Sequence, residues 1–133
     1  CVGETASERI DGETRDVVHD QLLGGLANIT SEELSQVIIA YEPVWAIGTG
    51  QNARPTDVVE AIVIIRTQLK HLYGSKVANE VQILYGGSVT SDSAADYLAL
   101  PEVDGLLVGG ASLEAYAFSQ ITEKAYQNIR GKE

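Results

Sequence analysis

Two stretches of the sequence decide the fold: LYGGSV at residues 84–89 and LVGGAS at residues 107–112. In each stretch a short apolar run leads into Gly-Gly and then into residues that can begin a helix. Barrels of parallel strands commonly bind phosphate after their last two strands, so two such turns in succession are typical of a barrel. A small doubly wound sheet would show the same alternation of strands and helices, but it would not need this pair of turns.

Short apolar runs and longer amphipathic segments alternate along the whole chain. Such short runs are typical of buried parallel strands, and they cover residues 36–41, 81–85 and 105–108, with Cys1-Val2 as the end of a fourth. Apolar residues recur at helical spacing in residues 14–29, 56–73, 91–100 and 113–129. The order predicts an α/β fold of four βα units. A full (β/α)8 barrel takes about 250 residues, so this chain matches about half of one.

The pattern runs without a linker or a low-complexity segment. Residues 1–133 are therefore expected to belong to one domain without an internal boundary. The first residues, beginning at Cys1, resemble the last residues of a strand, and we expect the rest of the barrel to precede them.

The composition limits the partners of this chain. Nine basic and nineteen acidic side chains give a formal net charge of −10, which argues against nucleic acid, whose phosphates need a basic surface. No run approaches the roughly 20 apolar residues of a membrane-spanning helix, so no membrane partner is expected. The single cysteine, Cys1, fits a reducing compartment. One cysteine and two distant histidines make no metal-ligand set.

Glu42 is the candidate catalytic residue. It follows the strand predicted at residues 36–41, and the carboxyl ends of strands form the catalytic face of a barrel. Its neighbours Tyr41, Pro43, Val44 and Trp45 are apolar, an environment in which a carboxylate can act as a general base. A solvated glutamate that merely begins a loop is the plainer interpretation, and the segment that follows argues against it.

Residues 43–50, PVWAIGTG, are predicted to form a lid over the site, and we call them the lid segment. Its Pro-Val-Trp start is stiff and apolar, whereas its Gly-Thr-Gly end can absorb large backbone rotations. A rigid tip between such ends suits a loop that opens and closes. An apolar loop at the mouth of a barrel also needs something to cover.

The two Gly-Gly turns are the candidate phosphate site. Glycine lets the backbone approach an anion closely, and amides at the start of a helix are free to donate to it. Ser88 adds a hydroxyl donor. One such turn is a weak signal because tight turns use glycine freely. Two of them together could bind phosphate without any lysine, which suits so acidic a protein.

The strings AYEPVWAIGTG, YGGSV and LVGGASL, in this order and spacing, closely resemble the triosephosphate isomerase family, as does the opening CVGET. The resemblance covers essentially the whole chain and implies strands five to eight, the C-terminal half of a TIM barrel. It implies that Glu42 is the base and that the substrate phosphate is bound by Gly48, Ser88, Gly109 and Gly110. It also implies that the lid is latched by Glu4, Trp45, Ala53 and Tyr85. Gln51 departs from the lysine that many members carry.

The resemblance implies an intramolecular aldose–ketose isomerase. The family interconverts D-glyceraldehyde 3-phosphate and dihydroxyacetone phosphate in glycolysis and gluconeogenesis, in the cytoplasm, without a cofactor or metal. The expected partner is a small phosphorylated triose, with no nucleic acid and no membrane, and the parent enzyme is a homodimer.

The family also uses a lysine from strand one and a histidine from strand four, which have no counterpart here. His19 and His71 fall on predicted helices and are expected to be structural. The catalytic set is therefore incomplete, and the chain by itself is expected to be almost inactive.

Two other functions stay open at the level of the sequence. One is a different barrel enzyme with the same Gly-Gly phosphate site, acting on an indole or ribulose phosphate. The lid motif around Glu42 argues against it. The other is a non-enzymatic half-barrel that pairs with a copy of itself through its open strand edges.

Overall fold

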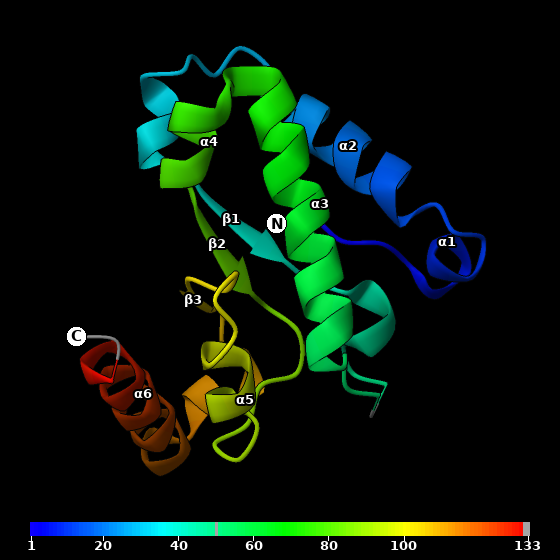
Figure 1. The fold of residues 1–133 in the computed structure, drawn as a ribbon. Coiled ribbons are helices and arrows are strands. Elements are labelled where there is room, and N and C mark those ends of the chain that lie inside the picture. Colours follow the sequence, from blue (N-terminus) through cyan, green and yellow to red (C-terminus); the bar gives the residue numbers. More distant parts are fainter. Residues whose placement is uncertain (50, 132–133) are drawn as a thin grey trace.

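The structure, a computed structural model, describes residues 1–49 and 51–131. Its centre is a parallel sheet of β1 (Ile38–Tyr41), β2 (Gln82–Tyr85) and β3 (Gly105–Leu106), in the order β1-β2-β3 (Figure 1). Tyr41 lies opposite Tyr85, and Tyr85 lies opposite Leu106. Val2 forms a parallel bridge to Tyr41, so the chain's first residues lie on the free side of β1. The strands follow one another in sequence order, as they do in a barrel.

The described part of the chain forms six α-helices. They are α1 (Ala6–Ile10), α2 (Thr14–Gly25), α3 (Pro55–Tyr73), α4 (Ser75–Glu80), α5 (Ala94–Leu98) and α6 (Ala115–Arg130). Of these, α2 and α3 pack over one face of the sheet (Figure 1). Short 3-10 turns occupy η1 (Glu33–Gln36), η2 (Val44–Ala46) and η3 (Gly110–Leu113). The α/β class and the alternation of elements are as the sequence predicts.

Several boundaries differ from the sequence prediction for local reasons. The helix predicted at 14–29 ends at Gly25, because two adjacent glycines are poor helix formers. The helix predicted at 91–100 shortens to α5, since the Thr90 amide donates to Ser93 Oγ at 3.0 Å and forms a turn instead. Gly74 ends α3 with a φ of 83°, a backbone conformation that glycine adopts readily. Helix α4, which the sequence analysis missed, begins directly after it.

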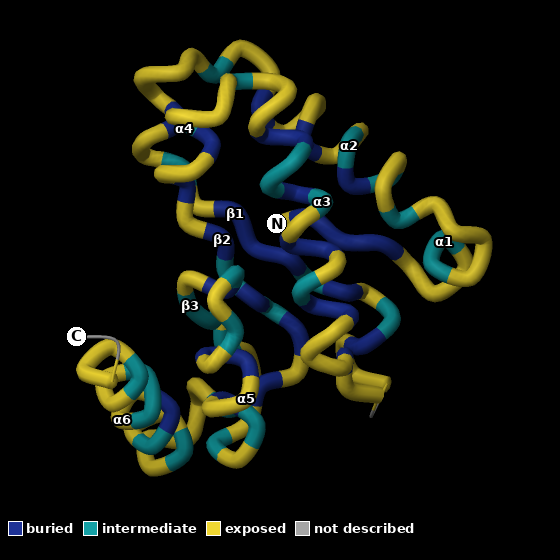
Figure 2. The backbone as a smooth tube through the Cα atoms, viewed as in Figure 1, coloured by how far each residue is buried: buried dark blue, intermediate teal, exposed yellow. Residues whose placement is uncertain are grey.

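The core lies between the sheet and helices α2 and α3, and Figure 2 shows dark blue along the strands and on parts of these helices. Alternate residues of a strand point to the same face. Ile39 and Tyr41 of β1 and Ile83 and Tyr85 of β2 are all at most 5% exposed. The stripes predicted on the two helices are largely confirmed, with these members buried: Val18, Leu22, Leu26, Val58, Ile62, Ile65 and Leu69. His19 Nδ1 lies 2.9 Å from Gln68 Oε1 and links α2 to α3.

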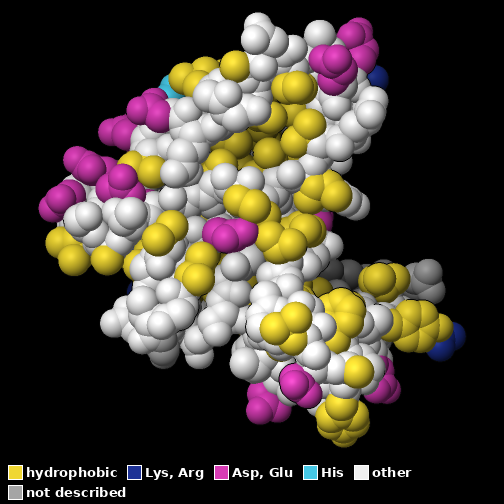
Figure 3. All heavy atoms as spheres, turned by 180° about the vertical axis from the view of Figure 1, so that it is seen from behind, with side chains coloured by type: hydrophobic (Ala, Val, Ile, Leu, Met, Phe, Trp, Pro, Cys, Tyr) yellow, Lys and Arg dark blue, Asp and Glu magenta, His cyan; other side chains and the backbone are white. Residues whose placement is uncertain are grey.

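The opposite face of the sheet has no covering helix in the described part of the chain. Ile38 is 56% exposed there, and Figure 3, seen from behind, shows hydrophobic side chains gathered on this face. The prediction that the strands are buried on both faces is therefore wrong for this face. In a complete barrel the inward-pointing residues of all eight strands fill the interior together, and four strands alone cannot close it.

A second apolar surface lies along α6. Ile121 is buried, but Phe118 and Ile129 are 44% and 63% exposed, so the predicted stripe on this helix is only partly covered. An apolar groove of about 410 Å³ separates the helix from β3 and α5, and Leu98, Leu106 and Val108 contribute to its walls. Within residues 1–49 and 51–131, no helix combines the length and apolar character needed to cross a membrane.

Truncation of a core side chain on α3 tests this packing. Ile65 is fully buried, whereas Val63 on the same helix is 49% exposed. Ile65→Ala should lower the free energy of unfolding by about 2–5 kcal/mol, because it removes buried methyl groups and leaves a cavity. Val63→Ala should change it by less than about 0.5 kcal/mol. Urea unfolding of the chain followed by circular dichroism measures both, and equal effects would contradict the assignment of the core.

Candidate active site

Glu42 immediately follows β1 and is half-buried at the carboxyl end of the sheet. Its amide donates to the Val2 carbonyl at 2.8 Å, which fixes the backbone at this position. Glycines on both sides leave room for it: a Cβ on Gly3 would lie 1.7 Å from the Glu42 carbonyl oxygen, and one on Gly86 would lie 2.8 Å from Glu42 Cγ. Glycine at position 3 thus makes room for the Glu42 main chain, and glycine at position 86 makes room for its side chain.

All five residues that the sequence singles out for catalysis and substrate binding line one cavity of about 480 Å³: Glu42, Gly48, Ser88, Gly109 and Gly110. They come from the ends of β1, β2 and β3 and from the lid segment, over sixty residues of sequence. Parallel strands bring their carboxyl ends to one edge, and this topology is what gathers them. Ile47, Val89 and Leu107 add apolar surface to the cavity.

The main-chain amides around the cavity are suited to an anion. Among the described residues, the amides of Gly48, Ser88, Gly109 and Gly110 donate to no other protein group. Gly48 has a φ of 69°, a conformation that a residue with a side chain rarely adopts. The neighbouring Ser112 amide and hydroxyl are already satisfied by the Gly109 carbonyl, at 2.9 and 2.6 Å, which holds the second Gly-Gly turn in shape.

Gly87 has a different role from its neighbours. A Cβ at this position would lie 2.1 Å from the Tyr85 hydroxyl oxygen, so the second glycine of the first turn makes room for this tyrosine. Burial raises the pKa of Tyr85, and its hydroxyl has no hydrogen-bond partner in the described part of the chain. This glycine therefore serves the packing beneath the site.

The resemblance names Tyr85 and Ala53 among the latch residues, and the structure adds Tyr97 as a hydrogen-bond partner of Ala53. The Tyr97 hydroxyl of α5 donates to the Ala53 carbonyl at 2.9 Å, and both residues are buried. The rings of Tyr97 and Tyr85 pack with centroids 4.2 Å apart. The sequence analysis missed Tyr97 because it reads there as one more apolar residue on a short helix.

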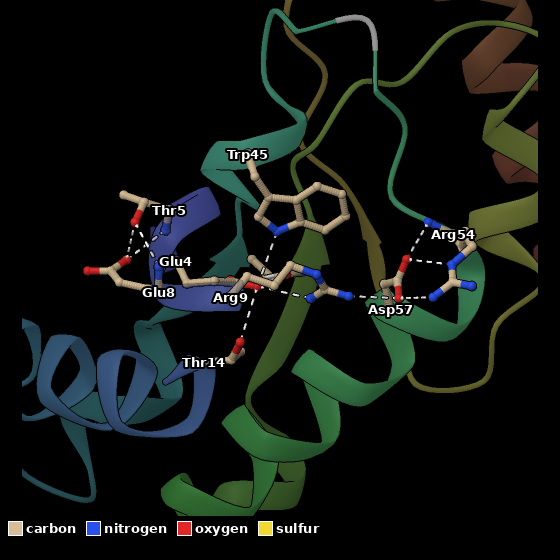
Figure 4. Close-up of polar contacts among 9 residues, drawn as sticks. Glu4, Thr5, Glu8, Arg9, Thr14, Trp45, Arg54 and Asp57 are labelled. Carbon is tan, nitrogen blue, oxygen red and sulfur yellow. Dashed lines mark hydrogen bonds and ion pairs between the residues drawn. The ribbon is translucent and has the colours of Figure 1, made fainter. Parts of the chain in front are cut away.

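The N-terminal end of the lid is held by Glu4, as the resemblance suggests. The Glu4 side chain is fully buried and accepts from Trp45 Nε1 at 3.1 Å and from the Tyr41 hydroxyl at 3.1 Å (Figure 4). The pKa of Tyr41 is raised, mainly by burial and secondly by the nearby negative charge of Glu4. Arg9 Nη1, 3.2 Å from Glu4 Oε1, supplies the compensating positive charge. The sequence analysis did not single out Arg9.

The rest of the lid segment makes local contacts. Thr49 Oγ1 donates to the Trp45 carbonyl at 2.9 Å and accepts from the Gln51 amide at 3.3 Å. Gly50, the predicted flexible end of the lid, lies outside the described residues. Cys1 is exposed. Over residues 1–49 and 51–131, no group of three or more His, Cys, Asp or Glu side chains is placed to bind a metal ion.

Comparison with known proteins gives one consistent answer. A family model described as triosephosphate isomerase matches residues 1–125. A triosephosphate isomerase from Chloroherpeton thalassium is 48% identical over 94% of this chain and 50% of its own length. Relatives of the same name from Carboxydothermus hydrogenoformans and Nitratidesulfovibrio vulgaris are 49% and 52% identical, over 92% and 91% of this chain and 49% and 48% of their own lengths.

The chain thus spans about half the length of the curated relatives it matches, and the matched part is their C-terminal half. Three parallel strands in sequence order, with Val2 bridged to the first, fit the C-terminal half of a TIM barrel. The lid motif, the two glycine turns and the family match agree over nearly the whole sequence, and the chain belongs to the triosephosphate isomerase family.

Proposed function

We propose that this chain supplies the catalytic base and most of the phosphate site of a triosephosphate isomerase. The reaction interconverts D-glyceraldehyde 3-phosphate and dihydroxyacetone phosphate, as in glycolysis and gluconeogenesis. The observation that carries this proposal is the shared cavity of Glu42, Gly48, Ser88, Gly109 and Gly110 in a chain of this family. We place the enzyme in the cytoplasm, with residues 1–133 as half of one barrel domain.

Glu42 is proposed to move a proton between the two carbons that exchange oxidation state. Its carboxylate takes the proton next to the carbonyl, an enediol-like intermediate forms, and the proton returns to the neighbouring carbon. A general base in position is typically worth about 10² to 10⁴ in rate. The reaction needs no cofactor, because the oxidation of one carbon is balanced by the reduction of the other.

The free amides around the cavity are proposed to bind the substrate phosphate. The chain as a whole carries a charge of −10, so an anionic substrate must be attracted locally. Amides of Gly48, Ser88, Gly109 and Gly110 offer that local attraction without a cationic side chain. Closure of the lid segment over the phosphate would exclude water and protect the intermediate.

The chain by itself is proposed to be almost inactive. The lysine and histidine that the family draws from strands one and four have no counterpart here, and electrostatic donors at the developing oxyanion are usually a large part of catalysis. The exposed face of the sheet and the groove along α6 are the surfaces that a front half would cover. The complete enzyme is proposed to be a homodimer with a small phosphorylated triose as substrate and no nucleic-acid or membrane partner.

Reconstitution tests the assignment of the base. The chain is mixed with the N-terminal half of the Chloroherpeton thalassium relative, and isomerase turnover is measured. The mixture should turn over, the chain alone should not, and Glu42→Gln should lower kcat by about 10² to 10⁴. Glu80→Gln, an exposed glutamate on α4, is the matched control and should have no effect. Unchanged turnover with Glu42→Gln, or full turnover from the chain alone, would refute the assignment.

Substitution of Gly86 tests the seat of Glu42. A methyl group at Gly86 meets Glu42 Cγ at 2.8 Å and must displace the side chain. Gly86→Ala should lower kcat at least tenfold in the reconstituted enzyme, because a misplacement of about 1 Å in an active site can cost about 10²-fold in rate. Gly24→Ala on α2, where a methyl group meets nothing within 4 Å, should leave kcat unchanged. Equal activity of the two variants would count against the proposed geometry.

Titration with inorganic phosphate tests the anion site in the chain alone. Nuclear magnetic resonance should show amide shifts concentrated at Gly48, Ser88, Gly109 and Gly110, since their N–H groups are free to donate. Sodium chloride at the same ionic strength is the control and should leave these amides unshifted. Shifts centred instead on Arg9 and Arg15, whose side chains border another surface groove, would contradict the proposed site.

A further inference from the structure

One arginine contacts both the lid segment and the helix that follows it. Arg9, in α1, places its guanidinium carbon 4.5 Å from the centroid of the Trp45 ring, at the N-terminal end of the lid. Its Nη2 donates to Asp57 Oδ1 at 2.8 Å, in the first turn of α3, the helix into which the lid leads. Figure 4 shows the guanidinium between Trp45 and Asp57.

The position of Arg9 is fixed by groups around it. Thr5 and Glu8 form a capping box at the start of α1, with the Thr5 amide donating to Glu8 Oε2 at 2.7 Å. Arg9 also donates to Glu4, whose fully buried carboxylate requires a cation because an unpaired buried charge is strongly destabilising. A planar guanidinium can meet two carboxylates and an aromatic ring at once, which a lysine cannot.

Asp57 is fixed as well. It is 5% exposed and accepts from the Arg54 amide and Nε, both at 3.0 Å, and from Arg54 Nη2 at 2.9 Å. The hydrogen bond from the Arg54 side chain holds the pKa of Asp57 below its usual range. Arg54 itself is 77% exposed and directly follows Ala53.

We propose that Asp57 and Arg9 are positioning residues for the lid: Asp57 orients the guanidinium, and the guanidinium holds Trp45 in its seat beside Glu4. The inference rests on the proposed role of residues 43–50 as a lid. The side-chain hydrogen bonds of residues 47–49 and 51–52 reach only residues within or next to the lid segment. The contacts of Trp45 are therefore what anchors the N-terminal end of the lid segment. Weakening either member of the pair should let the lid leave this position more readily.

Trp45 makes the test direct, because it is the single tryptophan of the chain. Arg9→Lys, Asp57→Asn and the double variant are compared with the unchanged 133-residue chain, by acrylamide quenching of the Trp45 fluorescence and by hydrogen exchange at residues 44–49. Each single variant should speed exchange there by about threefold to tenfold, the range expected for one cation–π or ion-pair contact. The double variant should be no faster than Arg9→Lys, because Asp57 acts through Arg9.

Arg54→Gln is the matched control. It also removes an ion pair from Asp57, but Arg54 does not contact Trp45, so exchange at residues 44–49 should stay within about twofold of the unchanged chain. The proposal is overturned if Asp57→Asn leaves exchange and quenching unchanged, if Arg54→Gln matches its effect, or if exchange rises equally in α2 and α3. If Arg9→Lys does not fold, the measurements on Asp57→Asn alone decide the outcome.

None of these readouts needs substrate or turnover. The expected exchange pattern in a chain that gives no isomerase activity with its front half would support the Asp57–Arg9 pair and contradict the proposed function. A reconstituted enzyme that is active but lacks the exchange pattern would support the proposed function and contradict the role of the Asp57–Arg9 pair.

Discussion

Each strand of the sheet hydrogen-bonds in parallel to the next strand in the sequence, so the carboxyl ends of Val2, β1, β2 and β3 lie along one edge. Every feature of the candidate site depends on this pairing. Glu42 follows β1 directly, and the two glycine turns follow β2 and β3. A slip of one residue would turn Tyr41 out of the core and Glu42 into it, which the burial of both Tyr41 and Tyr85 opposes.

The glycines near the site divide into two groups with different physical reasons. Gly3, Gly86 and Gly87 are tight positions where a Cβ would collide with Glu42 or Tyr85. At Gly109 and Gly110 a Cβ would meet no atom within 4 Å, so crowding by the protein does not require glycine there, and the close approach of a ligand is their proposed reason. This arrangement suits the proposed phosphate site of so acidic a chain, because amides supply positive potential without adding a charged side chain that its many carboxylates would neutralise.

The charged network beneath the lid segment is built around one buried carboxylate. A buried carboxylate, Glu4, is stabilised by two aromatic donors and by Arg9, and this places a cation against the face of Trp45. Asp57 then connects the cation to the helix that follows the lid. The same ionic cluster thus contacts Trp45 in the lid segment and Asp57 in the first turn of α3. By contrast, the bare face of the sheet and the groove along α6 are apolar surfaces of the kind that the other half of a barrel covers.

The sequence by itself determined the α/β class and the alternation of strands with the longer helices, because strand ends, helical stripes and glycine turns are local patterns. The same patterns pointed to Glu42 and to the two Gly-Gly turns, whereas Gly48 was named through the family motif. The sequence also pointed to Glu4 and Trp45, through a motif rather than through geometry. Only the tertiary structure decided that Tyr97 contacts Ala53, that Gly87 accommodates Tyr85, and that Arg9 joins Trp45 to Asp57. These contacts join residues as far as 48 positions apart, and such pairings depend on how helices pack around the sheet, which no local pattern records.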